Sequence, residues 1–138
     1  MKRTIFIAIV ALLLCAACEK KPTAGGPTIV GRWQLTDIFH ETSYGIVHDN
    51  TDDILIYDFR PSNELVVTSI EDGATTVSAN CSWAVYNDTL MMFQHREPGE
   101  EPGMPGVMLI QKLNSQTMRW RYLILGDMYI DLIRINNQ

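Results

Sequence analysis

The chain has 138 residues, of which 46% are hydrophobic and 20% charged, and its formal net charge is −5. All sixteen acidic residues follow position 18, so loss of Lys2 and Arg3 with a targeting segment would leave nine basic residues and a net charge of −7. That balance argues against nucleic acid and anionic lipid headgroups as partners. The 110 residues from 29 to 138 are enough to bury one hydrophobic core, which predicts a single domain.

Residues 1–17 have the composition of a secretory signal peptide, with a basic start and an apolar run from Ile5 to Leu14 that is too short to span a bilayer. The segment Leu14-Cys15-Ala16-Ala17-Cys18 resembles the lipobox of bacterial lipoproteins. That resemblance implies acylation of Cys18, with chains such as palmitate holding the protein on a membrane. We expect the outer membrane of a Gram-negative bacterium. The alternative is cleavage by the ordinary signal peptidase, which would leave a soluble periplasmic protein.

Residues 18–28 would carry the acylated cysteine and a flexible tether, because they contain two prolines and no apolar periodicity. With Cys15 in the signal peptide and Cys18 acylated, Cys81 has no partner for a disulfide within the chain. We therefore expect Cys81 to be a small buried hydrophobic residue.

From residue 29 onward, β-rich runs alternate with turn residues, and no stretch has a convincing helical period. The first run places Ile29, Gly31, Trp33, Leu35 and Phe39 on one face of a strand. Pro, Asn, Asp and Gly mark the connections between the runs. The predicted strands are 29–39, 53–59, 64–70, 75–86, 89–95, 107–112, 117–124 and 127–135.

Antiparallel strands joined in sequence order form a meander, and eight of them are about the number that closes into a barrel with a narrow interior. Closure also removes the edges that an open sheet exposes to aggregation. We therefore predict an all-β fold, an eight-stranded antiparallel up-and-down barrel. A two-sheet sandwich of the same strands is the alternative.

The first and last predicted strands carry the motif Gly31-Arg32-Trp33 and the basic residue Arg134. The motif resembles the Gly-x-Trp signature of lipocalins, and Arg134 resembles the basic residue that packs across this tryptophan in that family. The whole run 29–135 is similar to the lipocalin-like domains of small lipoproteins from Bacteroides-type bacteria. The resemblance implies a lipocalin-like barrel with an apolar pocket and no known catalytic residues. Physical reasoning agrees, because Gly31 lets a chain bend, Trp33 can plug the barrel end, and a guanidinium can lie on an indole face.

The predicted connections differ in length between the two ends of the barrel. The even-numbered connections are all tight, whereas the odd-numbered ones include two long segments. Long loops predict a mouth and tight turns a floor, so a ligand would enter at the odd end. Because the first strand begins at the floor, the tether would leave from the closed end and the mouth would point away from the membrane. The even connections are 60–63, 87–88 and 113–116, and the odd ones are 40–52, 71–74, 96–106 and 125–126.

Acidic residues gather on the connections predicted at the mouth, together with His40, His48 and His95. Carboxylates and imidazoles suit Zn²⁺ or Ca²⁺, but charges ordinarily lie on polar loops, and no ligand spacing such as His-x-His is present. We therefore expect neither a metal nor another cofactor. An acidic rim would disfavour anionic ligands such as free fatty acids. The acids are Glu41, Asp49, Asp52, Asp53, Glu71, Asp72, Glu97, Glu100, Glu101 and Asp127, with Arg96 as the basic residue among them.

Alternation along the strands indicates which side chains would point into the barrel. Among them we expect a ligand to contact Trp83, Met92, Met118, Trp120 and Tyr122. The alternative is a solid interior, since aromatic and methionine side chains also fill small barrels well. The predicted inward set is Trp33, Leu35, Cys81, Trp83, Val85, Leu90, Met92, Met118, Trp120 and Tyr122, with Arg119 and Arg121 outward.

The sequence carries no Gly-x-Ser-x-Gly motif and no glycine-rich phosphate loop, so we do not expect an enzyme. The leading interpretation is a membrane-anchored, lipocalin-like lipoprotein that binds a small apolar or amphipathic ligand in its barrel. The alternative is a non-catalytic protein-interaction or envelope accessory module with a filled barrel. The sequence identifies neither the ligand nor a protein partner.

Overall fold

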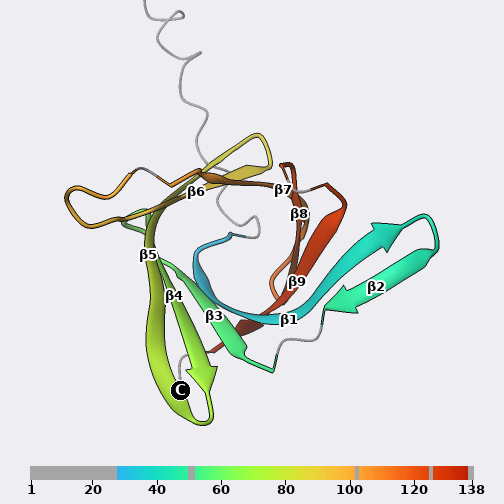
Figure 1. The fold of residues 1–138 in the computed structure, drawn as a ribbon, viewed down its shortest axis with the longest axis horizontal. Helices are drawn as coiled ribbons and strands as arrows, with labels where there is room; N and C mark the ends of the chain where they lie inside the picture. The colour runs from blue at the N-terminus through green and yellow to red at the C-terminus, as the bar shows by residue number, and fades with distance from the viewer. Residues whose placement is uncertain (1–27, 50–51, 102, 125, 137–138) are drawn as a thin grey trace, which may run out of the picture.

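The structure, a computed structural model, describes residues 28–49, 52–101, 103–124 and 126–136. It contains one antiparallel sheet of nine strands in the order β2-β1-β3-β4-β5-β6-β7-β8-β9, which pairing of β1 with β9 closes. Figure 1 shows the strands as a ring, with β2 lying outside it. The predicted signal peptide, Cys18 and the tether as far as residue 27 lie outside the described residues. In the part of the chain that the structure describes, no helix is long and apolar enough to cross a membrane.

Eight of the strands form the barrel wall, each paired antiparallel with its neighbours. The predicted eight-stranded up-and-down barrel is confirmed, and the two-sheet sandwich is excluded because the sheet closes on itself. The wall strands are β1 (Gly31–Thr42), β3 (Ile54–Phe59), β4 (Glu64–Glu71), β5 (Ala74–Tyr86), β6 (Thr89–Gln94), β7 (Gly106–Leu113), β8 (Thr117–Tyr122) and β9 (Met128–Ile135).

Tight turns at the floor follow from the residues that form them. Asn87 and Asp88 join β5 to β6 with φ angles of 47° and 62°. These are the left-handed values that a two-residue hairpin turn requires and that Asn and Asp tolerate. In the β7–β8 turn, the side-chain oxygen of Asn114 accepts the backbone N–H groups of Gln116 and Thr117 at 2.9 and 2.7 Å.

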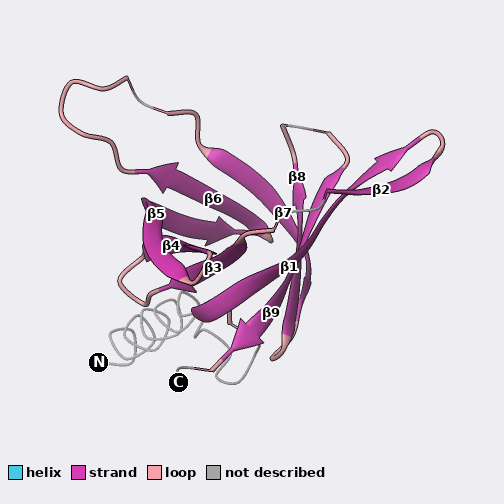
Figure 2. Ribbon diagram, turned by 60° about the horizontal axis from the view of Figure 1, so that its bottom comes forward, coloured by secondary structure: helices cyan, strands magenta, loops and turns pink. Residues whose placement is uncertain are grey.

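The segment 40–52 is not the loop that the sequence predicted, because β1 continues to Thr42 and pairs with an additional strand, β2 (Gly45–Asp49). Figure 2 shows the β1–β2 hairpin projecting from the barrel. All residues of β2 are exposed. A strand with no buried face leaves no alternation of apolar and polar residues in the sequence, which is why it was missed.

Phe39 faces outward, whereas simple alternation placed it with Trp33 on the inner face. The register of β1 against β9 shifts between Leu35 and Asp37, so Thr36 is an extra residue on β1. A β-bulge of this kind exchanges the inward and outward positions beyond it. Phe39 consequently stacks on Tyr129 on the outer wall, with 5.0 Å between ring centroids and 8° between ring planes.

Two arginines extend this aromatic pair on the outer wall. The Arg119 guanidinium lies 5.1 Å from the Phe39 ring centroid and forms two bonds to the Asp131 carboxylate, at 2.6 and 2.7 Å. Arg121 lies 6.0 Å from the ring of Tyr129. The predicted outward direction of both arginines is confirmed, and their contacts join β8 and β9 to β1 from outside the barrel.

Strand β8 ends at Tyr122, two residues before its predicted end, and β9 begins at Met128. The connection between them is therefore longer than the predicted segment 125–126. Leu123 and Ile124 are 49% and 52% exposed. Their apolar character suggested strand, but the strand ends before them, and the Leu123 N–H makes one further backbone bond, to the carbonyl of Val107 at 3.1 Å.

Trp33 closes the floor of the barrel. Its side chain is fully buried, and its Nε1–H donates to the carbonyl oxygen of Ile29 at 2.7 Å. The Arg134 guanidinium lies 4.2 Å from the indole ring, and a Cβ at Gly31 would collide with that guanidinium. The guanidinium also donates to three backbone carbonyls at 2.6 to 2.9 Å, those of Thr28, Val30 and Ser115.

Candidate functional site

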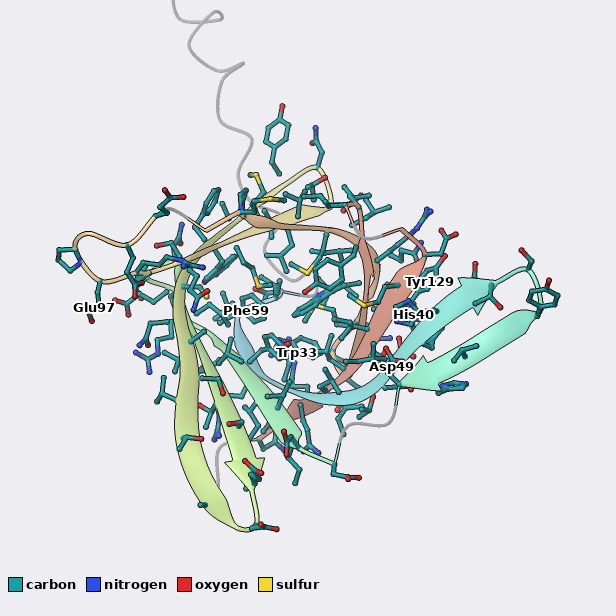
Figure 3. All side chains as sticks on the ribbon, in the orientation of Figure 1. Trp33, His40, Asp49, Phe59, Glu97 and Tyr129 are labelled. Carbon is teal, nitrogen blue, oxygen red and sulfur yellow. The ribbon has the colours of Figure 1, made fainter. Side chains whose placement is uncertain are left out.

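The register identifies the side chains that point into the barrel, because cross-strand partners share a face of the sheet. Trp33 pairs with Tyr57, and Phe59 pairs with Leu65. Figure 3 shows Trp33 and Phe59 within the ring of strands, whereas Glu97 lies on the β6–β7 loop away from it. Near the floor most of the inward side chains are buried in one core, although Trp83 is half-buried and Val85, which the register also places inward, is 43% exposed. The least exposed of them are Trp33, Phe59, Leu65, Leu90, Met108, Met118, Trp120 and Leu132.

Toward the opposite end, the inward positions on the same strands are only half-buried. Every wall strand contributes at least one such position. In a filled barrel these positions would be buried, so solvent reaches the interior from this end. The barrel is therefore solid at the floor and accessible above it, in a region that we call the mouth half. The mouth half comprises Ile38, Leu55, Tyr57, Val67, Ala79, Met92, Gly106, Tyr122 and Met128.

The residues predicted to contact a ligand fall in both regions. Met92 and Tyr122 lie in the mouth half. Met118 and Trp120 are fully buried in the core below it. Trp83 is half-buried near the floor, where its ring meets Phe59 edge-to-face at 5.5 Å and its Nε1–H donates to the carbonyl of Glu64 at 3.0 Å. The structure thus places Met92 and Tyr122 where a ligand could reach them and places Trp83 and Met118 among the packing side chains.

Tyr57 is a mouth-half residue that sequence reasoning did not single out. Its ring packs edge-to-face on Trp120 at 5.2 Å between centroids. Burial, with smaller contributions from Tyr122 and Cys81, raises the pKa of Tyr57 well above its ordinary value, and burial also raises the pKa of Tyr122. Both phenols are neutral hydrogen-bonding groups at physiological pH. The shared phase of Leu55, Tyr57 and Phe59 in the sequence was the signal that could have found it.

Cys81 is buried and free, as predicted. Burial raises the pKa of its thiol, so the sulfur stays protonated. It lies on the inner face opposite Leu65 and belongs to the core cluster. A protonated, buried thiol is a poor nucleophile, and its position assigns it to packing.

The acidic side chains at the rim are partly neutralised by individual partners. His40 Nε2 lies 2.8 Å from the Asp49 carboxylate within the β1–β2 hairpin. Arg121 bonds to Asp127 at 2.8 Å, so Arg96 is not the lone basic residue at this end. The acids of the β4–β5 turn and the β6–β7 loop are exposed.

The three histidines do not converge on one site. His40 and His48 each contact a single aspartate, the latter Asp37 at 2.9 Å. His95 Nε2 lies 2.6 Å from the Ser82 hydroxyl oxygen. Among the described residues, no group of three or more His, Cys, Asp or Glu side chains is arranged to hold a metal ion.

Comparison with known proteins gives fold neighbours and no sequence relatives. No protein-family model matches the chain, and no curated protein matches its sequence. A lipocalin-like protein from Bacteroides uniformis ATCC 8492 superposes with a TM-score of 0.61 at 14% identity, covering 77% of this chain and 97% of that chain. An uncharacterized protein from Bacteroides eggerthii DSM 20697 superposes with the same TM-score at 12% identity, covering 77% of this chain and 98% of that one.

These matches define the class of the fold. The chain is an all-β protein with a closed, antiparallel, up-and-down barrel of the lipocalin-like kind. At such low sequence identity the likeness extends to the fold alone. Any ligand must therefore be argued from the side chains of the mouth half.

Proposed function

We propose that this protein is a membrane-anchored, lipocalin-like lipoprotein that binds a small apolar or amphipathic molecule in the mouth half of its barrel. The observation that carries this proposal is the half-buried inner surface on all eight wall strands, above a buried core at the floor. Ligand pockets are typically concave, mostly apolar and furnished with a few polar groups. The mouth half fits that description, with aliphatic and methionine side chains and two phenols.

The anchor is proposed from the sequence around Cys18. Acylation there would attach the protein to the outer membrane through the segment that leads into β1 at the floor. The mouth would then point away from the lipid surface, and the acidic rim would lie farthest from it. Replacing Cys18 with Ala should move the protein from the membrane fraction to the soluble fraction. A Cys18→Ala protein that sediments with membranes as the parent does would overturn the anchor.

Ligand binding can be tested with the soluble Cys18→Ala chain and the neutral apolar dye N-phenyl-1-naphthylamine. We expect saturable enhancement of dye fluorescence. Met92→Lys should weaken it about tenfold or more, because a lysine in the apolar interior must be desolvated. Met91→Lys is the matched control, because Met91 pairs with Ala84 on the outer face of the same strand. Absence of dye binding, or equal loss in both variants, would contradict an interior site.

A non-catalytic protein-interaction module is the second candidate, and one feature favours it. The β1–β2 hairpin ends in Tyr44, which is 102% exposed, and β2 adds Ile46 and Val47, which are 59% and 51% exposed. Exposed aromatic and aliphatic groups on a projecting strand resemble the anchors of protein interfaces. Loss of a partner on Tyr44→Ser substitution, with dye binding unchanged, would support this second function.

We infer a binding role rather than catalysis. Lipocalin-like barrels serve chiefly as binding scaffolds, and the exposed Ser82–His95 contact has no carboxylate among its described partners. A hydroxyl beside an imidazole needs an orienting group and an oxyanion site to act as a nucleophile. Screening for esterase activity with a p-nitrophenyl ester should give no rate above that of a Ser82→Ala variant.

A further inference from the structure

The inner surface carries almost no charge. On the inward register positions of the eight described wall strands there is no Asp or Lys, Glu71 at the exposed outer end of β4 is the one acidic residue, and Arg134 is the one permanent cation. Arg134 lies at the floor over Trp33, with its N–H groups committed to three backbone carbonyls. His40 lies at the outer end of the inward row on β1, where Asp49 holds its Nε2. An ionised ligand inside the barrel would therefore lose its hydration without gaining a counter-charge.

The same surface offers hydrogen-bond donors that the chain does not use. Tyr57 and Tyr122 point inward in the mouth half, and neither hydroxyl is bonded to another described residue. Trp120 lies on the inner face next to Tyr122 along β8, and its ring packs on Tyr57. Its Nε1–H is buried and has no acceptor within the described parts of the chain. Buried polar groups in native proteins are nearly always paired, so the buried indole N–H, on the same inner surface as the two phenol hydroxyls, calls for an acceptor.

The rim adds a repulsive element against anions. Glu41 lies on β1 near the mouth, Glu71 is the last residue of β4 at the same end, and Asp72 follows it on the β4–β5 turn. The carboxylates of such a rim lower the local concentration of anions and slow their entry. The interior and the rim therefore both select against anionic molecules.

We infer that the ligand of the mouth half is an uncharged molecule bearing a hydrogen-bond acceptor, such as a ketone or an ester, whose oxygen accepts hydrogen bonds from the hydroxyls of Tyr57 and Tyr122; this inference rests on the proposed binding function. Burial keeps both phenols protonated, so they remain donors across the physiological pH range. The apolar remainder of the molecule lies against Leu55, Val67 and Met92. Specificity then comes from the unpaired donors, because a ligand without the acceptor leaves them unsatisfied.

A matched series of three naphthalene compounds tests this inference by displacement of N-phenyl-1-naphthylamine from the soluble Cys18→Ala protein. The ketone 2-acetonaphthone has a neutral acceptor, 2-ethylnaphthalene has nearly the same shape without one, and 2-naphthoate carries a charge. We expect the ketone to bind tightest and the carboxylate weakest. Tyr57→Phe and Tyr122→Phe should each weaken the ketone about three- to tenfold and leave 2-ethylnaphthalene unchanged. Tyr86→Phe is the control, because Tyr86 is 71% exposed.

The outcomes separate the ligand class from the binding function. If 2-naphthoate binds as well as the ketone, or if the Phe variants weaken the ketone and 2-ethylnaphthalene equally, the inferred chemistry is wrong while interior binding stands. If neither the dye nor any of the three compounds binds, the proposed binding function itself fails. Ketone binding that depends on the two tyrosines supports both.

Discussion

A methyl group added at Gly31 should destabilise the barrel chiefly by displacing Arg134. Gly31 has φ of 132°, and its Cβ position coincides with the Arg134 guanidinium. Gly45, in the β1–β2 hairpin, has a similar φ of 127°, but nothing lies within 4 Å of its Cβ position. The two glycines therefore form a pair with similar φ in which Gly31 alone has the contact with Arg134.

The size of the difference follows from what Arg134 does at the floor. Alanine at either position forces the backbone strain of about 1–3 kcal/mol that a side chain meets at such a φ. At Gly31 the guanidinium must also leave the Trp33 ring, now 4.2 Å away, which forfeits roughly 0.5–2 kcal/mol. At least one of its carbonyl bonds would break as well, at about 1 kcal/mol. We expect Gly31→Ala to lower the free energy of unfolding by about 1.5–3 kcal/mol more than Gly45→Ala.

Urea denaturation of the Cys18→Ala protein, followed by tryptophan fluorescence, measures both values. The same two substitutions in an Arg134→Ala background isolate the contact between residue 31 and Arg134. In that background both should lower the free energy of unfolding by the same amount. Equal costs of Gly31→Ala and Gly45→Ala in the presence of Arg134 would refute the steric reasoning. An excess at Gly31 that persists without Arg134 would place its origin elsewhere.

Three further substitutions, one of them with a control at Phe93, probe the floor, the outer wall and the interior. Trp33→Ala should lower stability by about 3–5 kcal/mol, and an unchanged melting temperature would show that Trp33 is not the plug. Because the bulge buries the Phe39 ring against Tyr129, Phe39→Ala should lower the free energy of unfolding by several kcal/mol. Phe93→Ala, at a ring that is 46% exposed, should lower it by about 1 kcal/mol or less. Because burial raises the pKa of Tyr57 above 10.0, the phenol ionises first in the unfolded state, so the contribution of Tyr57 to stability is intact below pH 10 and is lost above it. Tyr57→Phe should make that alkaline fall shallower in urea titrations, and an identical pH profile would contradict the burial of the phenol.

The wall of the barrel could be predicted because its residues obey local rules. Strands with one buried face alternate apolar and polar residues, and Asn87 and Asp88 suit a two-residue hairpin turn. The contrast between tight and long connections also anticipated which end of the interior solvent reaches. Arg134 lies over Trp33 in the structure, at the place that the resemblance to lipocalins implied.

The features that the sequence did not reveal depend on long-range pairing. Strand β2 has no buried face. It is held to the end of β1 by backbone pairing and by His–Asp contacts, and neither produces a periodic pattern of apolar residues in the sequence. The bulge at Thr36 is a property of β1 against β9, which lie far apart in the chain. Tyr57 became a candidate only once the register placed it across from Trp33 and beside Val67.

The bulge also accounts for the space above the floor. Without the extra residue Thr36, position 39 would share the inner face with Trp33 and Leu35, and the Phe39 ring would point into the mouth half. With it, the smaller Ile38 faces inward, opposite Ile130. The displaced ring becomes the centre of the outer stack with Tyr129 and Arg119. A single inserted residue thus moves a large aromatic group from the interior to the outer wall, where it stabilises the barrel without occupying the space that a ligand would need.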